Sequence, residues 1–184
     1  MSTIVDHQIR SLARSSGLIE PFEAEQVNPC SYDVRLGSNI LTEGWAIGPQ
    51  EKRERWLPYD ISSDTYLMEP GEFVLAATLE YIRVPVDMEC VFQLKSSRGR
   101  EGYNHALAGF IDPGFCGRVT LELHNLNSHH LLPLKAGMLI GQLRFMQLNS
   151  KPMRSYAVTG HYQGDTDVMP SKVSITGIAS VPED

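Results

Sequence analysis

The chain has 184 residues, with 16 basic and 22 acidic side chains and a formal net charge of −6. This length suits one domain with a buried core, and 42% hydrophobic and 21% charged residues are typical of a globular protein. The negative charge argues against nucleic acid, whose binders carry a basic face. The sequence contains no apolar run long enough to span a membrane and no signal-peptide pattern. We therefore expect neither a membrane nor nucleic acid as a partner.

The cysteines and histidines exclude two further classes of protein. Cys30, Cys90 and Cys116 are odd in number and widely spaced, which argues against a disulfide framework and favours a reducing cytoplasm, or the host cytoplasm for a virus-encoded protein. No cysteine pair has zinc-ligand spacing, and His129 and His130 are adjacent, so we expect no zinc site. Walker A and GxGxxG motifs are missing.

The first predicted elements are a helix and a strand. Residues 4–16 form an amphipathic pattern that Asp6 can cap and Gly17 can end. The period then changes to two, which predicts a half-buried strand over 32–36 that ends at Gly37.

Short strands and turns make up most of the remaining chain. The polar segment 43–64 is predicted as a loop, with the charged stretch 51–55 exposed to solvent. Strands are expected at these positions: 73–80, 90–94, 105–111, 118–125 and 138–148. This pattern predicts a barrel or sandwich with short helices over residues 1–150, followed by an irregular tail over 151–184.

The segment from Lys95 to Arg100 carries three basic residues directly after a predicted strand. A serine cap and the exposed N–H groups of a short helix suit a phosphate oxygen, and Ser96 and Arg100 lie four residues apart, on one helical face. Taken alone, the segment fits a solvated basic turn better than a binding site, because basic clusters are common on surfaces.

Two acidic residues lie in or before the predicted strand 118–125. Alternation turns Val119, Leu121 and Leu123 to one side, so Glu122 faces the other side from the middle of an apolar strand. Glu122 is either an ordinary solvent-facing residue or a partly desolvated general acid or base with a raised pKa. Asp112 starts an Asp-Pro-Gly turn, which explains it without a catalytic role.

The tail contains an aromatic, glycine-punctuated segment from Tyr156 to Gly164. Such a segment either closes over a ligand as a lid or simply packs on the surface.

Taken together, these segments resemble the dCTP deaminase family of the dUTPase-like superfamily nearly end to end. The resemblance rests on ordered blocks: Ser31–Gly37, Pro70–Leu75, Lys95–Ser97 with Arg100, Ala108–Phe115, Thr120–Leu123, Gly137–Leu143 and Tyr162–Gly164. It implies a mainly β fold, a distorted β-barrel with short helices, that forms a homotrimer with three active sites shared between subunits.

The resemblance also implies a role for each matching residue. Glu122 is the expected acid and base that activates water for attack on cytosine, with Ser96, Arg100 and Ala108 holding the water and the ring. The expected nucleotide contacts are Lys95, Ser97, Arg98, Gly99, Asp112, Thr120, Leu121, Gln142, Tyr156, His161 and Asp165. Magnesium is expected to arrive on the triphosphate, with no protein side chain as its ligand.

One departure from the family lies in the tail. Many members read Lys-Tyr-Gln-Gly-Gln where this chain reads His161-Tyr162-Gln163-Gly164-Asp165. Asp165 therefore places a negative charge where a phosphate is expected.

The leading functional prediction is a zinc-independent dCTP deaminase that releases dUTP and ammonia, with dTTP as a possible inhibitor. The first alternative is a bifunctional enzyme that also cleaves dUTP to dUMP and pyrophosphate, with Asp112 activating the second water. The second alternative is a non-catalytic trimer that binds nucleotide as a regulator.

Overall fold

The structure is a computed structural model, and it describes residues 2–47 and 53–172. Its strands are β1 (Ser2–Thr3), β2 (Ile19–Glu20), β3 (Val27–Asn28), β4 (Ser31–Ile47), β5 (Arg53–Asp60), β6 (Tyr66–Met68), β7 (Phe73–Arg83), β8 (Met88–Leu94), β9 (Tyr103–Asn104), β10 (Phe110–Ile111), β11 (Cys116–Asn125), β12 (Leu132–Leu134) and β13 (Leu139–Gln147). The helical segments are α1 (Asp6–Ser16), the 3₁₀ turn η1 (Ala24–Gln26), α2 (Ser96–Glu101) and α3 (Tyr156–Thr159). No helix in these described ranges is long and apolar enough to cross a membrane.

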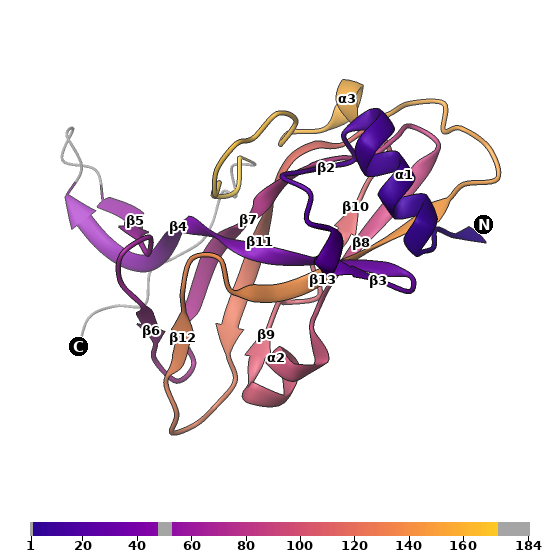
Figure 1. The fold of residues 1–184 in the computed structure, drawn as a ribbon. Coiled ribbons are helices and arrows are strands. Elements are labelled where there is room, and N and C mark those ends of the chain that lie inside the picture. The colour runs from indigo at the N-terminus through magenta and orange to yellow at the C-terminus, as the bar shows by residue number, and fades with distance from the viewer. Residues whose placement is uncertain (1, 48–52, 173–184) are drawn as a thin grey trace.

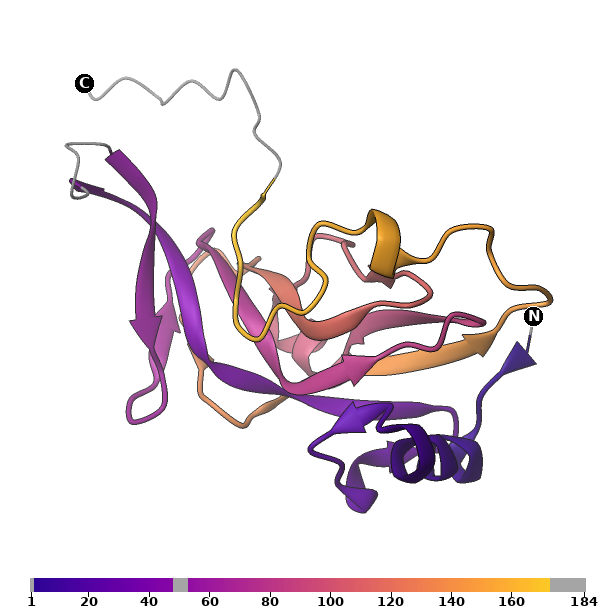
Figure 2. The same cartoon turned by 90° about the horizontal axis from the view of Figure 1, so that it is seen from above.

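One strongly curved sheet forms the body of the molecule (Figure 1). Its main path runs β10-β8-β13-β4-β7-β11-β9, and all the strand pairs are antiparallel. The curled sheet is an open, distorted barrel, so the prediction of a mainly β fold with short helices is confirmed. The helix α1 and the tail after β13 lie on opposite sides of this sheet (Figure 2).

The predicted N-terminal helix is confirmed, with a different start. Val5 caps α1, and its N–H donates to the Gln8 side chain over 3.1 Å, so Asp6 is the first helical residue rather than the cap. The helix ends at Gly17, whose φ of +62° is the left-handed conformation that glycine adopts readily. Ile9 is completely buried and joins the main core.

The predictions fail where pairing between strands overrides local composition. The strand that begins near Tyr32 continues through Gly37, where the backbone passes close to that of Ala77, and β4 ends only at Ile47. It pairs with β5 in a long hairpin, so the loop expected over 43–64 is wrong for residues 43–47 and 53–60. Both views show this hairpin at the end of the molecule opposite the N-terminus (Figures 1 and 2). Residues 48–52 of that prediction lie outside the described residues.

The strand expected over 105–111 is also mostly wrong. Only β10 forms there, and a turn in which Ala106 and Leu107 have positive φ angles of 53° and 60° separates it from β9, which precedes the predicted range. The strands expected over 73–80, 90–94, 118–125 and 138–148 are confirmed as β7, β8, β11 and β13. All three cysteines are free thiols, as the sequence predicts.

Candidate active site

A pocket of about 450 Å³ lies between the sheet and the tail. Six of the residues predicted for the site line it: Ala108, Asp112, Thr120, Glu122, Tyr156 and Asp165. They come from the loop before β10, the turn after it, β11 and the tail, which are up to 57 positions apart in the chain. The topology therefore gathers in one pocket residues that the sequence presents as separate weak signals.

Glu122 lies in this pocket because β11 alternates strictly. Buried and half-buried residues follow one another from Cys116 to Asn125, so Leu121 and Leu123 enter the core while Glu122 faces the pocket. Its partner across the sheet is the buried Leu75 on β7. Burial raises the pKa of the Glu122 carboxyl above its ordinary value.

The surroundings of Glu122 differ from those of the buried Glu80. Within the described residues, no other residue forms a hydrogen bond with its carboxylate, whereas the buried Glu80 bonds to Arg35. An unpaired carboxylate with a raised pKa takes and returns a proton more readily than one held by a cation. Glu122 is therefore partly desolvated with a raised pKa, and its role as an acid or base stays a prediction.

Asp112 lies at the edge of the same pocket. Its carbonyl accepts the N–H of Phe115 at 3.1 Å, and Gly114 has a φ of +88°, so the predicted turn is confirmed. The Asp112 side chain is exposed and remains available to a ligand. Tyr156 packs edge-on against Phe115 with 5.5 Å between ring centroids, which brings the start of the tail to this turn.

The tail follows the outer edge of β11. Gly164 donates its N–H to the Cys116 carbonyl at 2.8 Å, and the Arg118 N–H donates to the Asp165 carbonyl at 2.8 Å. The Met169 N–H donates to the Thr120 hydroxyl at 3.3 Å. The neighbouring strand β9 pairs with β11 only at its end, at His124 and Asn125, so the edge beside Glu122 faces the pocket and the tail.

The end of the described tail is held by side chains. Val168 is buried against Leu75 and Ala77, and the Asn39 amide donates to the Asp167 carboxylate at 2.6 Å. The described part of the tail, up to residue 172, thus packs against the sheet, and its function as a lid stays a prediction.

The carboxylate of Asp165 is paired with the ammonium group of Lys172. The Lys172 ammonium donates to both carboxylate oxygens of Asp165, at 2.6 and 2.8 Å, and to the His161 carbonyl at 3.2 Å. The same ammonium lies 5.3 Å from the centre of the Tyr162 ring. The negative charge that departs from the family pattern is therefore neutralised within the chain, while the His161 side chain is exposed.

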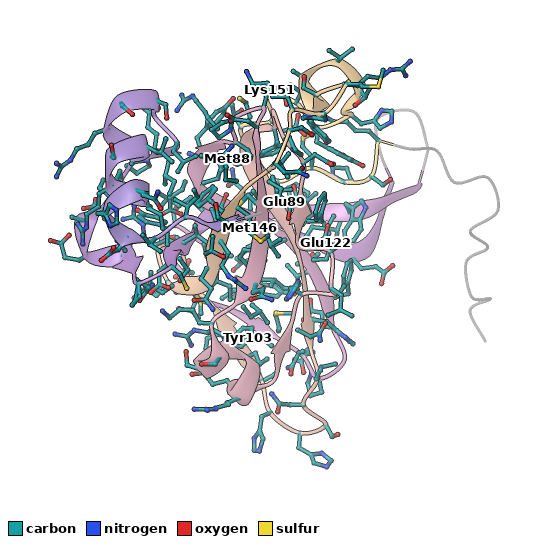
Figure 3. All side chains as sticks on the ribbon, turned by 90° about the vertical axis from the view of Figure 1, so that its right-hand side faces the viewer. Met88, Glu89, Tyr103, Glu122, Met146 and Lys151 are labelled. Atoms are coloured by element: carbon teal, nitrogen blue, oxygen red, sulfur yellow. The ribbon has the colours of Figure 1, made fainter. Side chains whose placement is uncertain are left out.

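The basic segment predicted to bind phosphate lies on α2 and does not line the pocket. Tyr103 marks the position of α2, because it follows that helix after Gly102. Figure 3 shows Glu122 at the middle of the sheet and Tyr103 well away from Glu122. In a single chain the structure does not bring Ser96 and Arg100 together with Glu122.

Ion pairs engage two of the three cations of this segment. The Lys95 ammonium bonds the nearly buried Asp33 carboxylate, and Arg98 bonds the Leu139 carbonyl at 3.0 Å and the Glu101 carboxylate at 2.5 Å. Lys95 rather than a serine precedes the first helical residue, so the expected serine cap is wrong. The exposed members of the segment are Ser96, Ser97, Gly99 and Arg100.

The last two predicted contacts lie outside the pocket as well. Gln142 sits on β13 between Asp33 and Gln93 of the neighbouring strands and accepts the Ser31 hydroxyl at 3.2 Å. The Leu121 side chain is buried in the core, which leaves only its backbone for a ligand.

Comparison with known proteins identifies the family. The family model described as dCTP deaminase-like matches residues 3–148. The chain belongs to the dCTP deaminase-like family.

Similar proteins cover nearly the whole chain. A Rhodococcus opacus (strain B4) protein named "dCTP deaminase, dUMP-forming" is 39% identical over 178 residues, which is 91% of this chain and 94% of the relative. A protein of the same name from Mycolicibacterium smegmatis is 38% identical over 186 residues, covering 95% and 98%.

The fold agrees with a solved structure of the family. The crystal structure of 2'-deoxycytidine 5'-triphosphate deaminase from Agrobacterium tumefaciens matches with a TM-score of 0.63 at 23% identity. The match covers 78% of this chain and 48% of that chain, so the present chain corresponds to about half of that protein. The likeness supports the fold predicted from the family resemblance.

Several pocket residues are not among the predicted ones. Arg118 was identifiable from the same alternation that places Thr120 and Glu122 on one face. Trp56 and Phe73 form an aromatic wall with 6.0 Å between ring centroids, and the sequence contains no signal for Trp56 because it lies in the segment predicted as a loop.

The carboxylates, histidines and cysteines of the described residues are not arranged to hold a metal ion by themselves. Among the residues that the structure describes, no three His, Cys, Asp or Glu side chains are grouped to hold a metal ion. Of the two aspartates in the pocket, Asp165 is already paired with Lys172. These residues fit a magnesium ion that is bound mainly by phosphate oxygens and water.

Proposed function

We propose that the chain is a bifunctional dCTP deaminase that converts dCTP to dUMP, ammonia and pyrophosphate. The observation that carries this proposal is Glu122, a carboxylate with a raised pKa that lines the pocket and has no hydrogen bond from another described residue. The names of the similar proteins, which specify dUMP formation, favour the bifunctional activity over release of dUTP.

In the first step, water adds to carbon 4 of cytosine. Glu122 takes a proton from the water as the new C–O bond forms and gives it to ring nitrogen N3, which leaves a neutral tetrahedral intermediate. It then moves the proton of the new hydroxyl group to the amino group, so that the C4–O bond becomes a carbonyl as the amine departs. The C–N bond breaks, ammonia leaves, and uracil remains. The raised pKa of Glu122 suits this exchange because the carboxyl must both accept and release a proton.

In the second step, another water attacks the α-phosphorus of dUTP. Asp112 lines the same pocket with an exposed carboxylate and is the proposed base for this water. The bond to the bridging oxygen breaks, and dUMP and pyrophosphate leave. Magnesium held on the phosphates would neutralise their charge, and Asp112 is the pocket carboxylate available to bind water of its shell.

Ser96 and Arg100 need a second copy of the chain to take part. They lie on α2, outside the pocket that contains Glu122. We therefore propose the homotrimer with shared sites, in which α2 of one copy completes the pocket of its neighbour.

The test is to incubate the purified protein with dCTP and magnesium and to separate the nucleotides chromatographically. We expect dUMP and pyrophosphate, with little free dUTP. Accumulation of dUTP would instead support a deaminase alone, and saturable nucleotide binding without turnover would support a regulatory protein. Adding dTTP to the same assay tests inhibition.

A further inference from the structure

Arg118 is the one basic residue among the described side chains that line the pocket. It is half-buried on β11, and alternation places it on the same face as Thr120 and Glu122. Its backbone N–H bonds the tail, but within the described residues its guanidinium has neither an ion pair nor a hydrogen bond. A half-buried cation without a partner is costly, and an anion in the pocket would compensate it.

The two ends of the pocket differ in chemistry. At the Glu122 end the opposite strand contributes Leu75, and next to it lie the rings of Phe73 and Trp56. These three side chains are apolar, and their rings suit the flat face of a base.

The other end is polar. Arg118 lies four residues before Glu122, which is about 13 Å along an extended strand. The register irregularity between Arg118 and Thr120 leaves this end of β11 opposite Tyr81. If the base of a nucleotide lies beside Glu122, its sugar and phosphates can extend along β11 as far as Arg118.

The acidic groups near this end do not neutralise Arg118. The Asp165 carboxylate is bound to Lys172 through both oxygens, and only its backbone carbonyl contacts Arg118. Asp112 forms no ion pair within the described part of the chain and is exposed. The guanidinium therefore remains available for a phosphate oxygen, which it can bind through two N–H groups.

We propose that Arg118 binds the phosphate chain of the nucleotide and so orients the base toward Glu122. This inference rests on the proposed function and adds a residue to it, because the phosphate contacts expected from the family lie at α2 and in the tail, not on β11. It assigns the direction of the substrate in the pocket.

The experiment measures binding by isothermal titration calorimetry in the Glu122→Gln background, where turnover is not expected. The ligands are dCTP with magnesium, dCMP and deoxycytidine. Arg118→Gln should weaken dCTP binding by about 10- to 100-fold, the loss of one charge-assisted contact, and leave deoxycytidine unchanged. Arg118→Lys should restore part of the affinity. Arg14→Gln, an exposed position on α1, is the matched control.

The results separate a phosphate contact from a structural role. An equal loss for dCTP and deoxycytidine would overturn the proposal, as would unchanged dCTP affinity in Arg118→Gln. The proposed function is tested separately by turnover in the unmodified protein. If that protein binds dCTP through Arg118 but releases no product, the proposed function fails and this inference stands. If no nucleotide binds, both fail.

Discussion

Glu122 is an ionisable carboxyl group in a partly buried position, where its charged form is unfavourable. Its place on β11 partly removes it from water, and no other described residue supplies a hydrogen bond to its carboxylate. Ionisation is therefore less favourable in the folded chain than in the unfolded one, which the raised pKa expresses. The residue proposed to be catalytic is one that reduces stability.

We expect Glu122→Gln to abolish deamination and to raise the melting temperature near neutral pH. Because the folded pKa is raised, ionised Glu122 costs stability above the ordinary glutamate range, and this cost disappears as acid protonates the carboxyl in both states. The stability difference between the two proteins should thus shrink on going to low pH. Thermal unfolding across pH and an ammonia-release assay measure both effects.

Glu25→Gln, at an exposed position in η1, is the control for this substitution. It should change neither activity nor melting temperature. Normal turnover by Glu122→Gln would remove Glu122 from the proposed mechanism, and a lower melting temperature would contradict the desolvation argument.

At the scale of elements, the tail lines the pocket, and its function as a lid is a prediction. Residues 155–172 include an α3 of four residues, and several of their contacts are made to β11. Val168 supplies an apolar anchor on Leu75 and Ala77. We expect such a segment to detach without unfolding the sheet, because its described residues form no strand of the sheet and lie at the surface of the main core.

Val168→Asp should detach the tail by placing a carboxylate against an apolar surface. We expect a higher KM for dCTP and faster proteolytic cleavage within 155–172, with the main unfolding transition nearly unchanged. Val158→Asp is the matched control, since Val158 on α3 is 80% exposed. If both variants behave alike, or if Val168→Asp unfolds the whole domain, the tail is not an independent lid.

At the scale of the whole molecule, the candidate site is divided between two places. Glu122 and Asp112 line the pocket, and Ser96 and Arg100 lie on α2. Neither place contains all four residues in a single chain. A second copy is the simplest source of the missing half.

Mixing two inactive variants tests this arrangement. Glu122→Gln and Arg100→Gln should each be inactive alone, and refolding them together should restore activity, because some mixed trimers contain one pocket with both native residues. Light scattering on the same samples measures the assembly. A monomeric protein with full activity, or no recovery from a mixture shown to be trimeric, would contradict the shared site.

The sequence alone determined the features that depend on local periodicity. Strand-like runs between turn residues located β7, β11 and β13. Strict alternation along β11 predicted the outward direction of Glu122, because a strand side chain must point to one face or the other. The same reasoning was available for Arg118. Ordered motifs placed the chain in its family before any fold was known.

Only the tertiary structure decided what depends on partners far apart in the chain. The polar β5 becomes a strand because it pairs with β4, and this pairing brings Trp56 to the pocket. Lys172 neutralises Asp165, and Asp33 neutralises Lys95. The formal charges of Asp165 and Lys95 in the sequence therefore overstate the repulsion and the attraction that these residues exert on a phosphate. The net charge of −6 argues against a basic face of the kind that binds nucleic acid. Whether a pocket contains an unpaired cation depends instead on which acidic and basic side chains form ion pairs in the folded chain.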